Sequence, residues 1–350
     1  MCQITKKAFG LTKSGLPVDL YTLANAKGTA VGIITYGGAV QSIRTPDKNQ
    51  QMRDIVLGYD SVADYEKQPF YIGALIGRCG NRLEKGKLRL NGQDYQLYCN
   101  DGRNHLHGGK AGFDKKIWTA AIKDNSLELT YTSPDGEENY PGTLRVTVVY
   151  ALSADNMLSL DYTATTDQDT ICNLTNHTYF NLGGCDSGSV LNQKIQLFAD
   201  RYTEADDASL PNGKLLPVDG TPLDLRQLTK IGEQIDAAFP QLQFAGGFDH
   251  NWVINDYDGR LKKAAYACDD ASGITLTTAT TLPGIQFYSG NYLEGTIAGK
   301  KQTAIVRRGG FCLETQYFPN ALAHANFPQP VLKKGETWRA KTTYAIGLLK

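Results

Sequence analysis

The sequence predicts an all-β protein, a large antiparallel β-sandwich with few short helices. Segments in which apolar and polar residues alternate recur along the 350 residues, as expected for strands with one buried face. The 36 glycines lie between and beside these segments and suit many short turns. Helical periodicity is sparse, and no low-complexity linker or fixed repeat divides the chain. We therefore expect residues 1–350 to form a single domain.

In the first half of the chain, residues 61–67 could make two helical turns. Residues 87–90 and 95–97 flank Asn91-Gly92, a strong hairpin signal because both residues tolerate the positive φ of a type I′ turn. Further alternating segments predict a strand at 126–131 and a hairpin of strands 144–148 and 158–163, joined through the turn at 154–156.

In the second half, hydrogen-bonding side chains alternate with apolar ones between Asn173 and Gly184, with His177 in the middle. This pattern predicts a strand that carries a titratable group on one face. Residues 199–248 are rich in Asp, Pro and Gly, which predicts a loop excursion, with a short helix at 229–238. Alternation predicts two more strands, at 274–278 and 338–344.

Composition narrows the possible partners and locations. The 36 basic residues cancel the 36 acidic ones, so nothing favours nucleic acid or an anionic membrane as a partner. No apolar run approaches the length of a membrane span, and the N-terminus lacks an apolar signal core. The seven cysteines are an odd number without a CxxC pair, which suits free thiols in a reducing compartment. We expect a cytoplasmic protein.

Several segments combine glycines with side chains that could bind a sugar. A polyhydroxylated ring needs planar donors and acceptors together with an aromatic floor. The segments are Gly77 to Arg82, Asn104 to Gly109, Gly246 to Trp252, Leu282 to Asn291 and Phe311 to Gln316.

Six motifs in the same order closely resemble the aldose 1-epimerases, or mutarotases, over nearly the whole chain. A single motif of this kind would be weak evidence for the family, but six motifs in the same order are specific evidence. The matching pieces are Gly77-Arg78 with Asn81-Arg82-Leu83; Leu106-His107-Gly108-Gly109 followed by Gly112-Phe113-Asp114-Lys115 and Trp118; Thr175 to Leu182; Phe248-Asp249-His250; Pro283 to Tyr288; and Glu314-Thr315-Gln316 with Phe318-Pro319-Asn320-Ala321.

The resemblance implies a mutarotase-like β-sandwich that interconverts the α and β anomers of free aldohexoses without a metal or an organic cofactor. The hemiacetal opens when its ring oxygen gains a proton while the anomeric hydroxyl loses one, and it recloses after rotation about C1–C2. By resemblance, His177 is the acid and Glu314 the base. Arg82 and His107, supported by Asn81, would bind sugar hydroxyls or developing charge, and Asp249 and Gln286 would bind further hydroxyls.

Each candidate also has a structural explanation. His177 could be a core histidine satisfied across strands, and Glu314 could face solvent from an edge strand. Arg82 could form a surface ion pair beside Glu84 and Lys85. Asp249 could cap the turn after Gly246-Gly247, and Asn81 and Gln286 could be turn or ladder residues.

A metal is the minority hypothesis. His105 and His107, at i and i+2 of a strand, would share a face and could chelate a metal together with His177. No HExxH motif or CxxC pair supports this arrangement. We therefore predict no metal and no cofactor.

Three other functions compete with mutarotation of a free aldose. A hexose-phosphate mutarotase should carry extra cations, and the late basic pairs are Lys300-Lys301 and Arg307-Arg308. A non-catalytic carbohydrate-binding protein should have lost the acid or the base. A two-carboxylate glycosidase would suit the fold, but we predict that no glycoside is cleaved.

Two positions depart from the family pattern, Cys79-Gly80 before Asn-Arg and Ala323 before His324. These changes leave the acid and base untouched but could alter loop packing or hydroxyl preference. We expect a monomer or a homodimer with a small-molecule aldose substrate.

Overall fold

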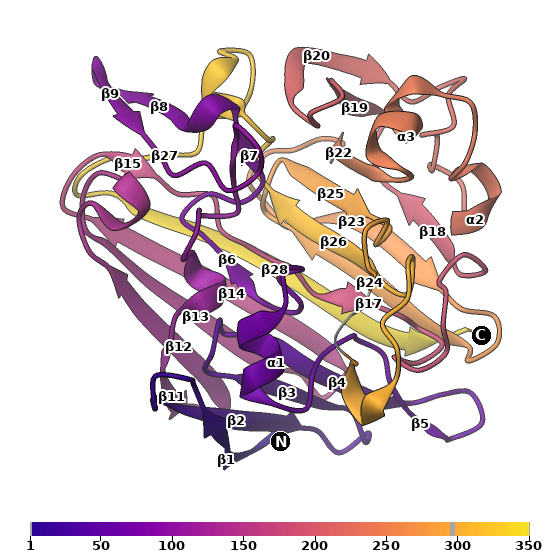
Figure 1. Cartoon of the computed structure of the whole chain (residues 1–350). Helices are drawn as coiled ribbons and strands as arrows, with labels where there is room; N and C mark the ends of the chain where they lie inside the picture. The colour runs from indigo at the N-terminus through magenta and orange to yellow at the C-terminus, as the bar shows by residue number, and fades with distance from the viewer. Residues whose placement is uncertain (1, 295–297, 350) are drawn as a thin grey trace.

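Figure 1 shows the computed structural model, which describes residues 2–294 and 298–349. Most of the strand residues lie in three antiparallel sheets. The central nine-stranded sheet has the order β11 (Thr119–Lys123), β12 (Ser126–Ser133), β13 (Leu144–Leu152), β14 (Met157–Thr166), β28 (Thr337–Leu348), β24 (Ile274–Thr280), β23 (Lys262–Cys268), β18 (Lys194–Leu197) and β21 (Thr229–Lys230).

Two smaller sheets accompany it. The six-stranded sheet has the order β17 (Tyr179–Phe180), β26 (Phe311–Gln316), β25 (Gly284–Tyr288), β22 (Asp249–Val253), β19 (Arg201–Ala205) and β20 (Pro211–Pro217). The five-stranded sheet runs in chain order, through β1 (Gln3–Leu11), β2 (Pro17–Ala24), β3 (Ala30–Ile34), β4 (Val40–Pro46) and β5 (Met52–Asp54).

Short strand pairs and helices complete the described chain. The pairs are β6 (Leu75–Ile76) with β16 (Thr175–Asn176), β7 (Arg82–Leu83) with β10 (His105–Leu106), β8 (Lys87–Leu90) with β9 (Gln93–Gln96), and β15 (Thr170–Ile171) with β27 (Val331–Leu332). The helices are α1 (Val62–Lys67), α2 (Ile231–Gln234) and α3 (Pro240–Ala245). Each helix in the described ranges is too short or too polar to cross a bilayer.

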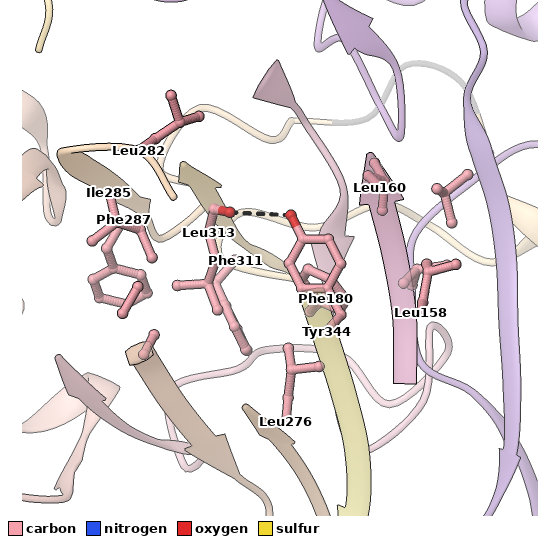
Figure 2. Packing of buried hydrophobic residues seen from close by; sticks show 14 of the residues in the cluster. Leu158, Leu160, Phe180, Leu276, Leu282, Ile285, Phe287, Phe311, Leu313 and Tyr344 are labelled. Atoms are coloured by element: carbon pink, nitrogen blue, oxygen red, sulfur yellow. Dashed lines mark hydrogen bonds between the residues drawn. The ribbon is translucent and has the colours of Figure 1, made fainter. Parts of the chain in front are cut away.

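The core lies between the six-stranded and nine-stranded sheets. Figure 2 shows Phe287 of β25 and Leu313 of β26 in the same buried cluster as Leu160 of β14 and Tyr344 of β28. The Tyr344 hydroxyl donates a hydrogen bond of 3.3 Å to the backbone oxygen of Leu313. Because successive strand residues point to opposite faces, burying Phe311 and Leu313 turns Cys312, Glu314 and Gln316 toward the other face of the six-stranded sheet.

The predicted all-β class is confirmed, and so are two of the local signals. Asn91 and Gly92 have φ of 51° and 80° between β8 and β9, the conformation that a type I′ turn needs. The helix predicted at 61–67 is α1, whose first turn is capped by the Ser61 side chain accepting from the Asp64 N–H.

The predicted loop at 199–248 is wrong, because it contains β19, β20 and α3. Its Asp and Pro residues mark the turn between two paired strands, where Asp206 Oδ1 accepts from the N–H groups of Ala208 and Leu210. The helix predicted at 229–238 shortens to α2, because Thr229–Lys230 instead forms the edge strand β21.

Candidate active site

A cavity of about 160 Å³ opens on the face of the six-stranded sheet that is turned away from the core. Six of the seven predicted site residues line it, namely Asn81, Arg82, His107, His177, Asp249 and Glu314. The seventh, Gln286, contacts this group through Asp249. Aromatic side chains complete the wall: Phe70, Tyr71, Tyr179, Tyr288 and Tyr292. The structure therefore brings together residues that lie as far apart in sequence as 81 and 314.

His177 lies between two sheets rather than within one strand, so the single strand predicted around it is wrong. β16 pairs with β6, whereas β17 pairs with β26, and His177 lies between β16 and β17. Its N–H donates to Ala74 O and its carbonyl accepts from Gly73 N, both at 2.9 Å. The crossing between sheets holds the backbone of His177 while its ring points into the cavity.

The ring of His177 is held by partners distant in sequence and not by its neighbours Asn176 and Thr178. Its Nδ1 is 3.4 Å from the sulfur of Cys312, and its Nε2 is 3.7 Å from Oε1 of Glu314. Asn176 and Thr178 bond to each other instead. Burial lowers the pKa of His177 to about 4, so the imidazole is neutral at neutral pH in the free protein.

Glu314 projects from the middle of β26 and is 2% exposed, which excludes a solvent-facing edge strand. Burial raises the pKa of Glu314 well above its usual range, and the Asp249 carboxylate raises it further, while Arg82 opposes the shift. Its Oε2 has no hydrogen-bond partner among the described residues. Glu314 therefore offers one oxygen to His177 and keeps the other free.

Asn81 and His107 hold each other in place beside this pair. Both have left-handed backbones, with φ of 60° and 51°. The Asn81 N–H donates to His107 Nδ1 at 3.1 Å, so a neutral His107 carries its hydrogen on Nε2. Burial lowers the pKa of His107 well below its usual range, with the neighbouring His177 and Arg82 adding to the shift. His107 is thus a fixed neutral donor.

Arg82 is held in place by Asp101. Its Nε donates to Asp101 Oδ2 at 2.7 Å, while Glu84 pairs with Lys85. Arg82 itself lines the cavity, and its ion pair is with Asp101 rather than with Glu84. Because Nε holds the arginine, its terminal nitrogens are available to a ligand.

Asp249 and Gln286 form one hydrogen-bonded unit on β22 and β25. The Gln286 Nε2 donates to Asp249 Oδ1 at 2.6 Å, and Gln286 lies directly opposite Glu314 in the ladder. Gln286 Oε1 has no partner among the described residues. Asp249, held by the Gln286 amide, thus presents a carboxylate at the side of the cavity that can accept from a sugar hydroxyl.

Within the described residues, one group of three side chains could hold a metal: His107, His177 and Glu314, whose ligand atoms lie within 4.8 Å. Ligation by His107 Nε2 would require removal of the hydrogen that the Asn81 N–H fixes there. The predicted alternative ligand His105 points away, with its ring nitrogens bonded to Tyr98 O and the Tyr140 hydroxyl. His105 is therefore not part of this group, and His107 is better suited to donate a hydrogen bond than to bind a metal.

Two features of the site went unnoticed in the sequence. Cys312 contacts His177, and its position two residues before Glu314 on a strand was an available signal, because i and i+2 share a face. The second feature is the set of tyrosines in the cavity wall, Tyr71, Tyr179, Tyr288 and Tyr292. The sequence indicated only that aromatic residues would contribute to a sugar site. Arg78, in contrast, belongs to a matched motif but is fully buried, and bonds the carbonyls of Ser133, Pro134, Pro141 and Gly142.

Known proteins match the chain over nearly its whole length. The family model for aldose 1-epimerase matches residues 19–345. Galactose mutarotase from Homo sapiens is 38% identical over 352 residues, covering 99% of this chain and 100% of that protein. Aldose 1-epimerase from Escherichia coli K12 is 34% identical over 337 residues, covering 95% and 96%. The crystal structure of galactose 1-epimerase from Lactobacillus acidophilus NCFM superposes with a TM-score of 0.87 at 26% identity, covering 100% of both chains.

Proposed function

Because the chain belongs to the aldose 1-epimerase family, it is an isomerase with mutarotase activity, and we propose that His177 and Glu314 are its acid and base. The observation that carries this proposal is their placement: two buried titratable groups face each other at 3.7 Å in the cavity. An anomeric centre presents two oxygens, one to be protonated and one to be deprotonated, and this pair can serve both.

Ring opening starts with a protonated His177 and an ionised Glu314. The His177 Nε2–H gives its proton to the ring oxygen as the bond from C1 to that oxygen breaks. Glu314 takes the proton of the anomeric hydroxyl as C1 becomes an aldehyde carbon. After rotation about C1–C2, the two transfers run backwards on the other face of the aldehyde. Each residue ends as it began, so no proton is gained or lost.

Burial of the two residues favours the state in which the sugar ring is open. It lowers the pKa of His177 to about 4 and raises that of Glu314 well above its usual range. The buried pair is therefore more stable as neutral imidazole and neutral carboxyl, which is the state it reaches when the sugar ring is open. Removal from water thus drives both proton transfers toward the open-chain aldehyde.

The remaining residues bind the sugar in this proposal. Arg82 and the Nε2–H of His107 donate to hydroxyls or to the developing charge on oxygen, and Asn81 fixes His107. Asp249 and Gln286 accept from hydroxyls further round the ring. Charged and buried hydrogen bonds of this kind orient a substrate as well as hold it.

The competing functions fit the cavity less well. A phosphorylated hexose would bring a dianion, but Arg82 is the one cation among the lining residues, and it is already paired with Asp101. The basic pairs that drew attention in the sequence are engaged elsewhere, with Lys300 bonded to Asp54 and Arg308 to Asp236. A non-catalytic sugar-binding protein has no need for a buried acid and base.

We also propose that the chain acts as one domain, as a monomer or homodimer, in the cytoplasm. The family match runs through all three large sheets, and the seven cysteines are free thiols, which suits a reducing compartment. Sedimentation of the purified protein measures the assembly.

Polarimetry of freshly dissolved α-D-glucose and α-D-galactose tests the function. We expect the enzyme to accelerate the approach to the equilibrium rotation for at least one of the two sugars. His177→Asn and Glu314→Gln should each lower kcat by at least about a hundredfold, as loss of a general acid or base does. Equal rates with and without the wild-type protein would contradict the activity, and full activity in either variant would contradict that residue's role.

A further inference from the structure

Beneath the cavity lies a group of buried polar side chains that bind nothing in the described part of the chain. The atoms without partners are both side-chain polar atoms of Asn251, both of Gln316 and the hydroxyl of Thr175. These residues are 2%, 0% and 1% exposed, and none lines the cavity itself. A buried polar group without a hydrogen bond costs about 1–3 kcal/mol, so such a cluster requires partners.

The strand register places this group directly under Glu314. Gln286 pairs with Asn251 on one side and with Glu314 on the other, so Asn251, Gln286 and Glu314 form one row across three strands. Gln316 lies two residues beyond Glu314 on β26, on the same face. Gly284 lies opposite Gln316, and a Cβ at Gly284 would collide with Asn251 Oδ1.

Asn251 and Gln316 therefore lie on either side of Gly284, over which the Phe318 ring also packs. Their strands flank β25 and are roughly 9.6 Å apart, two strand spacings. The two amides make no direct hydrogen bond. Gln316 Oε1 also lies 3.8 Å from the position of a Cβ at Gly80, and Thr175 Cγ2 lies 3.1 Å from that same position. Gln316 and Thr175 thus lie close together at Gly80, and the row of Asn251, Gln286 and Glu314 crosses the same face of the sheet.

We propose that Asn251, Gln316 and Thr175 bind ordered water beneath Glu314, and that this water hydrogen-bonds the inner carboxylate oxygen, Oε2. Buried water takes such sites, where two to four otherwise unsatisfied polar groups converge. Oε2 is the oxygen of Glu314 without a partner in the described chain, whereas Oε1 faces His177. Gln316 and Asn251 are then positioning residues, which act on the base through water and do not touch the sugar.

This inference rests on the proposed role of Glu314 as the base. A water that donates to Oε2 stabilises the ionised carboxylate and so opposes the rise in its pKa that burial causes. It also fixes the direction in which Oε1 points. Loss of the water should therefore change kcat and its pH dependence, and leave KM for the sugar almost unchanged.

Gln316→Met tests the inference, because methionine matches the length of glutamine but has no amide. We expect kcat at pH 7 to fall about tenfold and the alkaline limb of the kcat profile to move up by about one pH unit, since one pKa unit corresponds to a tenfold change. KM should change by less than about threefold. Asn251→Leu should act in the same direction. Thr278→Val, which removes a buried unpartnered hydroxyl on β24 of the other sheet, is the matched control and should keep the wild-type profile.

A wild-type pH profile in folded Gln316→Met and Asn251→Leu would overturn the inference, while activity lost in Glu314→Gln would leave the proposed function standing. If either variant fails to fold, a high-resolution crystal structure of the wild-type enzyme decides. Ordered water within hydrogen-bond distance of Gln316 and Glu314 Oε2 supports the inference, and a space filled by protein side chains overturns it.

Discussion

In the proposed mechanism, His177 and Glu314 share one exchangeable proton, and their burial sets the pH range in which the pair can work. The pair is inactive with two protons, because Glu314 is then no base, and with none, because His177 is then no acid. Such coupled groups titrate as a unit with two apparent pKa values. Burial lowers the pKa of His177 to about 4 and raises that of Glu314, which widens the range over which one proton is held.

We therefore predict a pH profile of kcat/KM in the free enzyme that is level around neutral pH. Its acid limb should lie near pH 4, where the second proton binds, and its alkaline limb well above the usual pKa of a carboxyl group. Mutarotation rates at constant ionic strength from pH 4 to 9 measure this, after subtraction of the buffer-catalysed rate. An acid limb near the ordinary histidine pKa of about 6.5 would contradict the predicted effect of burial.

Cys312 holds the far side of the His177 ring. A proton that arrives at Nε2 from the sugar or from Glu314 needs a neutral imidazole whose hydrogen is on Nδ1, and Nδ1 is 3.4 Å from the Cys312 sulfur. Burial raises the pKa of Cys312 well above its usual range, so the sulfur contacts the ring as a neutral thiol. Its contribution is to fix the orientation and tautomer of His177.

Cys312→Ala should lower kcat about tenfold, because a buried ring nitrogen that loses its partner costs about 1–3 kcal/mol. Cys312→Ser, which keeps a polar atom at this position, should retain activity within about threefold. Polarimetric measurement of kcat for both variants tests this difference in activity. Equal activity of the alanine and serine variants would show that the sulfur does not position the ring.

At the scale of elements, β25 decides the geometry of the site through its register with β22 and β26. Its inner residues Ile285 and Phe287 pack in the core, which turns Gly284, Gln286 and Tyr288 toward the cavity face. Gly284 has no Cβ where the Asn251 side chain and the Phe318 ring already lie. The glycine thus allows β22, β25 and β26 to carry bulky polar groups side by side.

Gly284→Ala should therefore lower both the melting temperature and kcat, because the new methyl group displaces Asn251 next to Gln286. Gly92→Ala is the comparison. Its φ of 80° strains any other residue, but no atom lies within 4 Å of the new Cβ, so it should cost about 1 kcal/mol and leave kcat unchanged. Thermal unfolding and polarimetry on both variants measure these effects. A wild-type kcat in Gly284→Ala would contradict the role given to the register.

These elements also show what the sequence could predict. The hairpin at Asn91-Gly92 follows from local turn chemistry, so it was predictable. The break at His177 was not, because the alternation of Asn173 to Gly184 is the same whether one strand or two short strands in different sheets carry it. The strands within 199–248 were obscured by turn residues, which mark where strands meet as well as where they are missing.

The site, too, has features that the sequence could predict and features that depend on the whole fold. The motifs placed His177 and Glu314 in one family pattern, and the structure brings the two side chains together. The support for His177 from Cys312 depends on strands that are distant in sequence, β17 and β26, lying next to each other. Pairing of that kind is set by the whole fold and leaves no local pattern.

At the scale of the whole molecule, buried histidines make stability depend on pH. Burial lowers the pKa values of His105, His107, His177 and His250, so below about pH 6.5 these rings bind protons only when the chain unfolds. Burial raises the pKa of Asp114 to about 6 and that of Glu314 further, so these two hold protons in the folded state and act in the opposite direction. Four histidines outweigh two carboxyl groups.

We predict that unfolding takes up about two protons near pH 5, so the free energy of unfolding falls by roughly 2–3 kcal/mol per pH unit on acidification. Urea titrations at pH 6.5, 5.5 and 5.0 measure this dependence. His250→Gln, a change away from the cavity, should weaken it. A free energy of unfolding that is constant over this range, or that rises on acidification, would contradict the burial of neutral histidines.

The claim that one proton is exchanged between His177 and Glu314 through the sugar has one direct test, a double-mutant cycle on kcat/KM by polarimetry. Two residues that act as a unit are strongly non-additive, because removing either one already abolishes the shared step. We predict that His177→Asn, Glu314→Gln and the double variant lose activity to within about threefold of one another. Losses that multiply in the double variant would show that the two side chains act independently, and would contradict the account.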